Sequence, residues 1–108
     1  MSRAKGNIAE KEALLFLQER GFELVEQNFY SKFGEIDIIM QKDNIYHFIE
    51  VKSAPSYEVA IANITPQKLS RIIKTAYVYM KKNSLNVEYS FDAVIVSDDI
   101  EFLENITL

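Results

Sequence analysis

Apolar residues in the first half of the chain change their spacing, and this pattern predicts one helix followed by three strands. From Asn7 to Gly21 they recur at helical spacing, and glycine is a common helix stop. Polar turns at 31–34 and 42–44 divide the alternating region that follows, whereas residues 53–64 have no clear period. The three strands are expected over residues 22–28, 35–41 and 45–52.

A second helix is expected from Pro66 to Lys82, because Thr65 is a good N-cap and proline suits the first helical position. A strand over 87–97 and a short apolar run over 100–103 follow it. This order of elements indicates an α/β fold. A length of 108 residues with 48% hydrophobic residues fits a single domain over residues 1–108.

The composition excludes several classes of chemistry. With no cysteine, a disulfide framework, a zinc finger and a cysteine nucleophile are all excluded. The single histidine, His47, would have to be the base of any serine triad, and we expect it to pack beside Met40, on the opposite strand face from Asp37 and Glu50. Catalysis must therefore rest on carboxylates, lysines or the backbone.

The sequence also carries expectations about location and partners. No apolar run approaches the roughly 18 residues of a membrane span, and the first residues lack the apolar core of a signal peptide. We therefore expect a cytoplasmic protein with no membrane partner. The net charge of −4 argues against broad, nonspecific coating of nucleic acid, but it leaves room for a local basic surface.

The second and third strands place carboxylates opposite one another. A two-residue loop at Asp43–Asn44, the commonest antiparallel connection, fixes which residues face each other. The apolar face then pairs Ile36 with Val51, Ile38 with Ile49 and Met40 with His47. The other face pairs Glu35 with Lys52 and Asp37 with Glu50, with Cβ atoms roughly 4.5–5.5 Å apart.

Two carboxylates at this separation repel by roughly 3 kcal/mol at an effective dielectric near 20. Lys52 offsets part of this cost, and a divalent cation would reverse it, since Mg²⁺ is held by one or two carboxylates with water and phosphate. The alternative is a solvated strand face on which Asp37 and Glu50 splay apart. The residues alone leave both interpretations open.

Asp37 followed by Glu50-Val51-Lys52 resembles the PD-(D/E)xK signature of restriction-endonuclease-like nucleases. The chain as a whole resembles the YraN family of bacterial proteins within that superfamily. The matching segments include Gly34-Glu35-Ile36-Asp37, Ile49-Glu50-Val51-Lys52, Asn28, Lys68 and Phe91-Asp92. Two arginines usual in the family are replaced, by residues 53–56 after the lysine and by Phe29-Tyr30 after the asparagine.

The resemblance implies a mixed central sheet flanked by helices and a nuclease that uses Mg²⁺ or Mn²⁺ to hydrolyse phosphodiester bonds in DNA. Asp37 and Glu50 would hold the metal, with Glu10 completing its shell. Lys52 would orient the attacking water or stabilise the developing charge. Glu10 has a second interpretation, as the capping-box partner of Asn7.

The second helix is the one basic segment of an acidic chain. It carries Lys68, Arg71 and Lys74 and no acid, so it is either a DNA-backbone contact or an ordinary solvated face. A noncatalytic nucleic-acid-binding or assembly module with the nuclease fold is the alternative function. A nuclease fold of this size commonly needs a homodimer to grip a duplex. Metal-dependent cleavage would separate the two functions.

Overall fold

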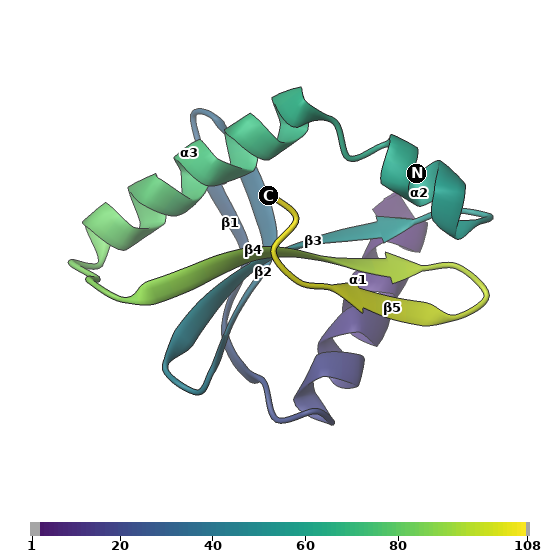
Figure 1. Ribbon diagram of the computed structural model, residues 1–108, viewed down its shortest axis with the longest axis horizontal. Helices are drawn as coiled ribbons and strands as arrows, with labels where there is room; N and C mark the ends of the chain where they lie inside the picture. The colour runs from purple at the N-terminus through teal and green to yellow at the C-terminus, as the bar shows by residue number, and fades with distance from the viewer. Residues whose placement is uncertain (1–2, 108) are drawn as a thin grey trace.

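The structure, a computed structural model, describes residues 3–107 and contains a mixed sheet with helices on both faces (Figure 1). Over these residues the elements are α1 (Arg3–Gln18), β1 (Glu23–Ser31), β2 (Gly34–Lys42), β3 (Ile45–Ser53), α2 (Tyr57–Ala62), α3 (Pro66–Lys82), β4 (Glu88–Val96) and β5 (Ile100–Leu103). The strands lie in sequence order, and neighbours are antiparallel except β3 and β4, which are parallel. A parallel pair needs a crossover connection, which here contains α2 and α3. None of the helices in this range is long and apolar enough to cross a membrane.

The α/β class and the predicted order of elements are confirmed, with one addition. Residues 53–64 contain α2, a helix of six residues with one buried side chain, Ala60, which is too short to show a helical period. Ser56 caps it, and its hydroxyl oxygen accepts a main-chain N–H at 3.3 Å. Thr65 and Pro66 begin α3 as predicted.

The start of α1 differs from the prediction. The helix begins at Arg3, so Asn7 lies in its interior. A side chain caps a helix from the position that flanks its first turn, and the predicted capping box of Asn7 with Glu10 is therefore wrong. The Glu10 carboxylate is free of this role and contacts β1 instead.

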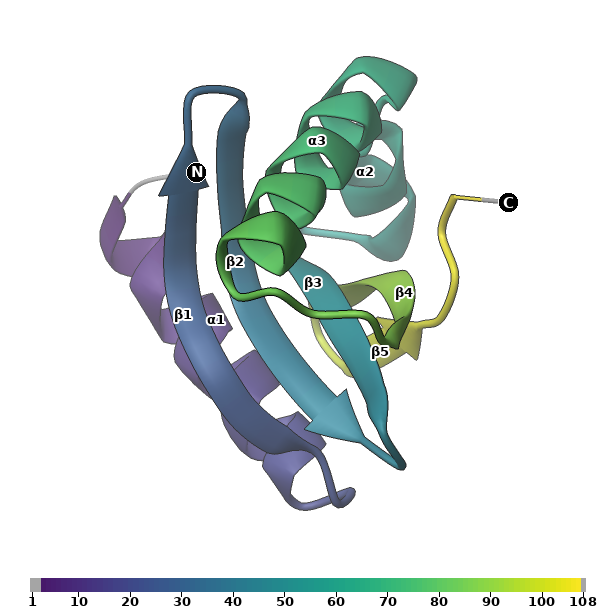
Figure 2. The ribbon, with the colours of Figure 1, turned by 90° about the vertical axis from the view of Figure 1, so that its left-hand side faces the viewer.

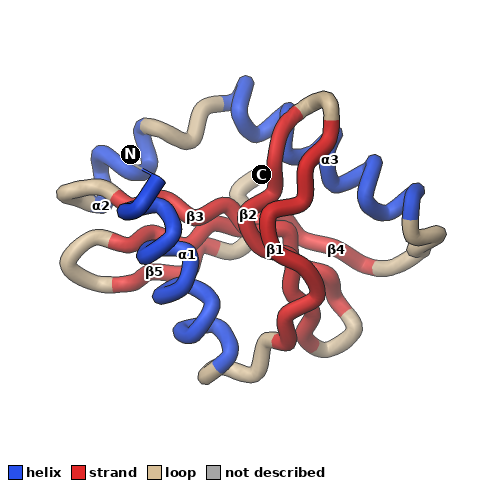
Figure 3. The backbone as a smooth tube through the Cα atoms, turned by 180° about the vertical axis from the view of Figure 1, so that it is seen from behind, coloured by secondary structure: helices blue, strands red, loops and turns tan. Residues whose placement is uncertain are grey.

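Two apolar clusters hold α1 and α3 on opposite faces of the sheet (Figures 2 and 3). Helix α1 buries Ala9, Ala13 and Leu17 in one cluster. Helix α3 contributes Ile72, Ala76, Tyr79 and Met80 to the other. Burying a side chain as completely as Leu17 contributes about 1.5–3 kcal/mol, so these stripes determine how each helix lies on the sheet.

The β2–β3 hairpin has the predicted register from its turn up to the pair Ile38–Ile49. Asp43 and Asn44 form the turn with φ of 52° and 66°, the left-handed values of a two-residue hairpin loop. Beyond Ile38–Ile49 the ladder ends. The predicted ladder pairs Ile36–Val51, Asp37–Glu50 and Glu35–Lys52 are therefore not formed.

The strands part here because each continues along a different neighbour. β2 follows β1, with Ile36 opposite Phe29, and β3 follows β4, with Val51 opposite Val94. The Asp37 carboxylate spans the opening, where its Oδ2 accepts the Val51 amide at 2.8 Å. We call this opening, between Asp37 on β2 and Val51 on β3, the fork.

The fork also changes which face β2 presents. Ile36 is predicted to share a face with Ile38 and Met40, but it packs in the cluster under α3, with Ile39. Ile38 and Met40 pack in the cluster under α1. The prediction for Ile36 is therefore wrong, because strict alternation does not continue through Asp37.

His47 is packed beside β2 as predicted, opposite Met40. Its ring meets Phe22 edge-on, with centroids 5.0 Å apart, and its Nδ1 lies 2.6 Å from Asp92 Oδ2. Asp92 is fully buried and also accepts hydrogen bonds from the Ser90 hydroxyl and the Asn105 amide. This carboxylate therefore joins β3, β4 and the segment after β5.

We expect Asp92→Ala to destabilise the fold by about 3–5 kcal/mol, because it removes the acceptor of three hydrogen bonds at a buried position. Urea unfolding followed by circular dichroism measures the loss. Asp98→Ala, at an exposed turn position, is the matched control and should change stability by less than about 0.5 kcal/mol. Equal stability of the two variants would contradict the role given to Asp92.

Candidate active site

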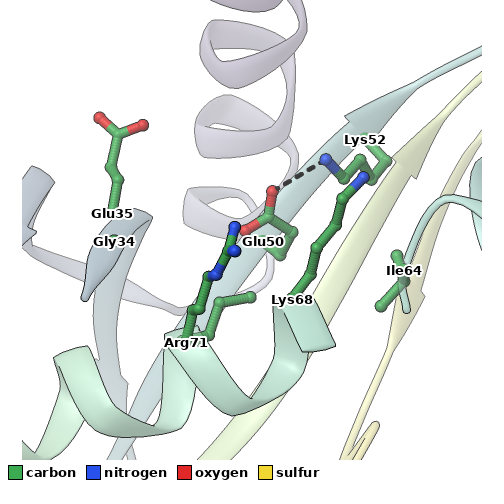
Figure 4. A pocket seen from close by; sticks show the side chains of 8 residues that line it. Gly34, Glu35, Glu50, Lys52, Ile64, Lys68 and Arg71 are labelled. Atoms are coloured by element: carbon green, nitrogen blue, oxygen red, sulfur yellow. Dashed lines mark ion pairs between the residues drawn. The ribbon is translucent and has the colours of Figure 1, made fainter. Parts of the chain in front are cut away.

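The fork brings together three of the side chains singled out in the sequence. Asp37, from β2, is 8% exposed, and the side chain of Glu50, from β3, is 16% exposed. Their carboxyl groups are hydrogen-bonded to each other. Lys52 lies two residues further along β3, with its Nζ 3.3 Å from Glu50 Oε1 (Figure 4). Asp37 and Glu50 thus meet through their side chains although their backbones are not paired.

A cavity of about 180 Å³ adjoins these groups, between the sheet and α3. It is lined by Gly34, Glu35, Glu50, Lys52, Ile64, Lys68, Arg71 and Ile72. In Figure 4, Lys68 and Arg71 extend from α3 toward Glu50 and Lys52, whereas Glu35 stands apart from them. The cavity therefore has two carboxylates and a lysine on its sheet wall and two cations on its helix wall.

Burial is the main influence on the acids. It raises the pKa of Asp37 from an ordinary 3.8 to about 8, and repulsion from Glu50 adds to the shift while the hydrogen bond from the Val51 amide opposes it. Burial likewise raises the pKa of Glu50, against the opposing attraction of Lys52. At neutral pH the pair therefore favours one proton shared between Asp37 and Glu50. A bound cation could take the place of that proton.

Glu10 approaches the pair from α1, and its negative charge contributes to the raised pKa of Asp37. Its Oε1 accepts a hydrogen bond from Asn28 Nδ2 at 3.0 Å, and the same nitrogen donates to Glu35 Oε2 at 3.3 Å. Asn28 thus ties together carboxylates from α1 and β2. Glu35 is held in this contact, and the described ion pair of Lys52 is with Glu50, so the predicted pairing of Glu35 with Lys52 is wrong.

Asn28 is a residue to which the sequence analysis gave no role. Its φ of 52° is left-handed, although it lies within β1. Asparagine tolerates this conformation better than most residues, and it is depleted in strands. The strand is predicted to end at residue 28, whereas β1 continues through it to Ser31, so the sequence offers only the asparagine itself as a signal.

The donor set fits a hard divalent cation. Asp37 and Glu50 supply carboxylate oxygens, which suit Mg²⁺ or Mn²⁺ and are poor for softer metals. Within residues 3–107 no three acidic or histidine side chains stand close enough together to enclose a metal by themselves. Mg²⁺ does not need such a cage, because it commonly keeps water and substrate phosphate as its remaining ligands.

The three basic residues predicted to contact nucleic acid are divided between two places. Lys68 and Arg71 line the cavity, and Lys68 Nζ also donates to the Asn63 carbonyl at 3.0 Å. Lys74 lies beside the turn between β1 and β2, with its Nζ 5.7 Å from the centre of the Phe33 ring. All three are exposed on α3.

A five-stranded mixed sheet flanked by helices is consistent with a restriction-endonuclease-like α/β fold. The model of the Uncharacterised protein family UPF0102, the YraN family, matches residues 9–96, and the chain belongs to this family. The UPF0102 proteins of Sulfurimonas denitrificans and Aliarcobacter butzleri are each 61% identical to it over the full length of both chains. The UPF0102 protein of Helicobacter pylori strain HPAG1 is 52% identical, over 97% of this chain and 92% of its own. The family model spans all the candidate site residues, from Glu10 to Lys74.

The raised pKa of Asp37 predicts that stability without metal falls as pH rises through about 8. The folded state holds the Asp37 proton more tightly than the unfolded state, and this difference stabilises the fold. The stabilisation is complete below the pKa of Asp37 in the unfolded chain and is lost above its pKa in the folded protein. We expect a loss of about 2–3 kcal/mol between about pH 6 and about pH 9.

Asp37→Asn should abolish this loss, because the amide keeps both hydrogen bonds and cannot ionise. Thermal melting of both proteins in chelator, across that pH range, is the measurement. Glu12→Gln, at an exposed position of α1, should retain the wild-type pH profile. Parallel profiles for Asp37→Asn and wild type would refute the shared proton.

The Asn28 contacts make a separate prediction. Asn28→Asp keeps the size of the side chain and tolerates the left-handed backbone, but it places a third carboxylate between Glu10 and Glu35. We expect it to lose about 1–2 kcal/mol near neutral pH and to recover as pH falls below about 4, where carboxyl groups protonate.

Asn28→Gly is the matched control, because it also accepts the left-handed φ but adds no charge. Its loss of stability should not depend on pH in this way. Urea unfolding of the three proteins at several pH values tests the contact. An Asn28→Asp variant that follows the pH profile of Asn28→Gly would contradict it.

Proposed function

We propose that the protein is a nuclease that uses Mg²⁺ or Mn²⁺ to hydrolyse phosphodiester bonds in DNA. The observation that carries the proposal is the pair of buried Asp37 and half-buried Glu50, with Lys52 beside it and a cavity whose helix wall is basic. A pair that serves only the fold would be more stable as one acid with a neutral partner. A cation that replaces the shared proton during function would explain why two acids stand together at this position.

Asp37 and Glu50 would hold the metal. When bound, the ion polarises a phosphate and lowers the pKa of an attacking water. Lys52 would donate to that water or to the negative charge that develops on the phosphate, and the contact of its Nζ with Glu50 supports this role. The Glu10 carboxylate, held by Asn28, adds negative charge near Asp37 and so favours the cation.

Lys68 and Arg71 face this group across the cavity and would bind the phosphate itself. The planar fork of an arginine suits the oxygen geometry of a phosphate. These two side chains would supply the phosphate contacts of the two family arginines that this chain lacks after Lys52 and after Asn28. Lys68 and Arg71 lie on a helix, whereas the positions of the two missing arginines are near the ends of β1 and β3.

A noncatalytic nucleic-acid-binding or assembly module is the second candidate. The two missing family arginines favour it, as does the lack of a closed group of three metal-ligand side chains in residues 3–107. Such a module would keep the fold and the basic wall and would bind DNA without cleaving it. Cleavage and binding must therefore be measured separately.

The test is incubation with linear, nicked and branched DNA in Mg²⁺, in Mn²⁺ and in chelator. We expect metal-dependent cleavage that falls to background in Glu50→Gln and by roughly 10²–10³-fold in Lys52→Met. At limiting metal, the rate should rise from about pH 6 to about pH 8, because the metal must displace the Asp37 proton.

Lys81→Met, on an exposed lysine near the end of α3, is the matched control and should cleave like wild type. Circular dichroism and melting establish that each variant is folded. DNA binding by wild type without cleavage of any substrate in either metal would reject the nuclease and support the noncatalytic module.

A further inference from the structure

The turn between β1 and β2, residues 31–34, stands beside the cavity and carries an exposed aromatic ring. Two cations lie near this ring, one from the turn and one from α3. We call this turn the hairpin tip. The Phe33 side chain is 36% exposed, with Lys32 Nζ 5.2 Å and Lys74 Nζ 5.7 Å from its ring centre. The next residue, Gly34, lines the cavity itself. The exposed ring therefore belongs to the residue next in sequence to one that lines the cavity.

Specific contacts hold the hairpin tip against α3. The hydroxyl oxygens of Ser31 and Thr75 are 2.8 Å apart, and Ser31 Oγ also accepts the Phe33 amide at 3.0 Å. The backbone at Gly34 adjoins α3, since a Cβ there would make an ordinary van der Waals contact, 3.5 Å from the Cβ of Arg71. The Phe33 ring is thus presented at a defined position relative to the basic wall of the cavity.

Charge around the hairpin tip is opposite in sign to that of the whole chain. The net charge is −4, yet the exposed charged side chains of the tip and the adjoining part of α3 are all cations, Lys32, Lys68, Arg71 and Lys74, and the adjacent Glu35 is half-buried. A cluster of cations around an exposed ring favours a polyanion with flat apolar groups. Single-stranded nucleic acid has this chemistry, because its phosphates bind cations and its unpaired bases stack on aromatic rings.

We propose that the Phe33 ring is a stacking platform for an unpaired base, and that the substrate of the adjacent site is DNA with a single-stranded segment. The inference rests on the proposed nuclease function. In the interior of an intact duplex the base faces are covered by neighbouring pairs, whereas an unpaired base offers Phe33 a free face on which to stack. Lys32 and Lys74 would then contact the phosphates on either side of that base.

The test compares binding in chelator, so that no cleavage occurs, to a single strand about 12 nucleotides long and to a blunt duplex of the same length. We expect wild type to bind the single strand more tightly. Phe33→Leu keeps an apolar side chain in the turn and removes the ring, and it should weaken single-strand binding by roughly 5- to 100-fold. Duplex binding should change by less than about twofold.

Tyr77→Leu is the matched control, because Tyr77 is also an exposed aromatic residue, on the part of α3 that contacts Tyr89. Its single-strand affinity should equal that of wild type. Stacking has its own signal: fluorescence of 2-aminopurine in the strand should be quenched by wild type and not by Phe33→Leu. The chain contains no tryptophan that would obscure this emission.

Equal loss of single-strand and duplex affinity in Phe33→Leu, no loss in either, or an unquenched probe with wild type would overturn the inference. Cleavage in Mg²⁺ or Mn²⁺, measured on the same two substrates, tests the proposed function separately. Quenching and selective binding without any cleavage would reject the nuclease and keep the stacking surface. Cleavage of both substrates that Phe33→Leu does not alter would keep the nuclease and reject the stacking surface.

Discussion

Burying the Asp37 carboxyl beside the Glu50 carboxyl is the constraint on which the rest of this structure depends. Two acids out of water need a shared proton or a cation, and they need donors for their remaining oxygens. The Val51 amide supplies one such donor, and it is available because β2 and β3 stop pairing at this point. The break in the ladder and the buried acid pair are thus two aspects of one arrangement.

Most of the fold could be predicted, because local patterns specify it. The cap at Thr65, the turn at Asp43–Asn44 and the register up to Ile38–Ile49 all depend on residues close together in the sequence. The break at Asp37 could not be predicted in the same way. It depends on where β1 and β4 continue, which is tertiary information that pairing rules for one hairpin do not contain.

The same distinction applies to the candidate site. Proximity of Asp37, Glu50 and Lys52 followed from the spacing of residues on two strands, and it survives although the backbone pairing does not. The position of Asn28 between Glu10 and Glu35 could not be deduced, since it joins a helix and two strands and requires a left-handed backbone. Nor could the sequence separate Lys68 and Arg71, which line the cavity, from Lys74, which does not.

The parallel pairing of β3 with β4 has a consequence for how the chain folds. The β2–β3 hairpin joins neighbours in sequence, so it can form early, while β4 must return across the whole α2–α3 connection before it pairs with β3. Until it does, Glu50 and Lys52 lie on an edge strand in contact with water, where a carboxylate keeps its charge at little cost. The return of β4 therefore removes the open edge of β3 and brings Glu50 and Lys52 into the interior of the sheet.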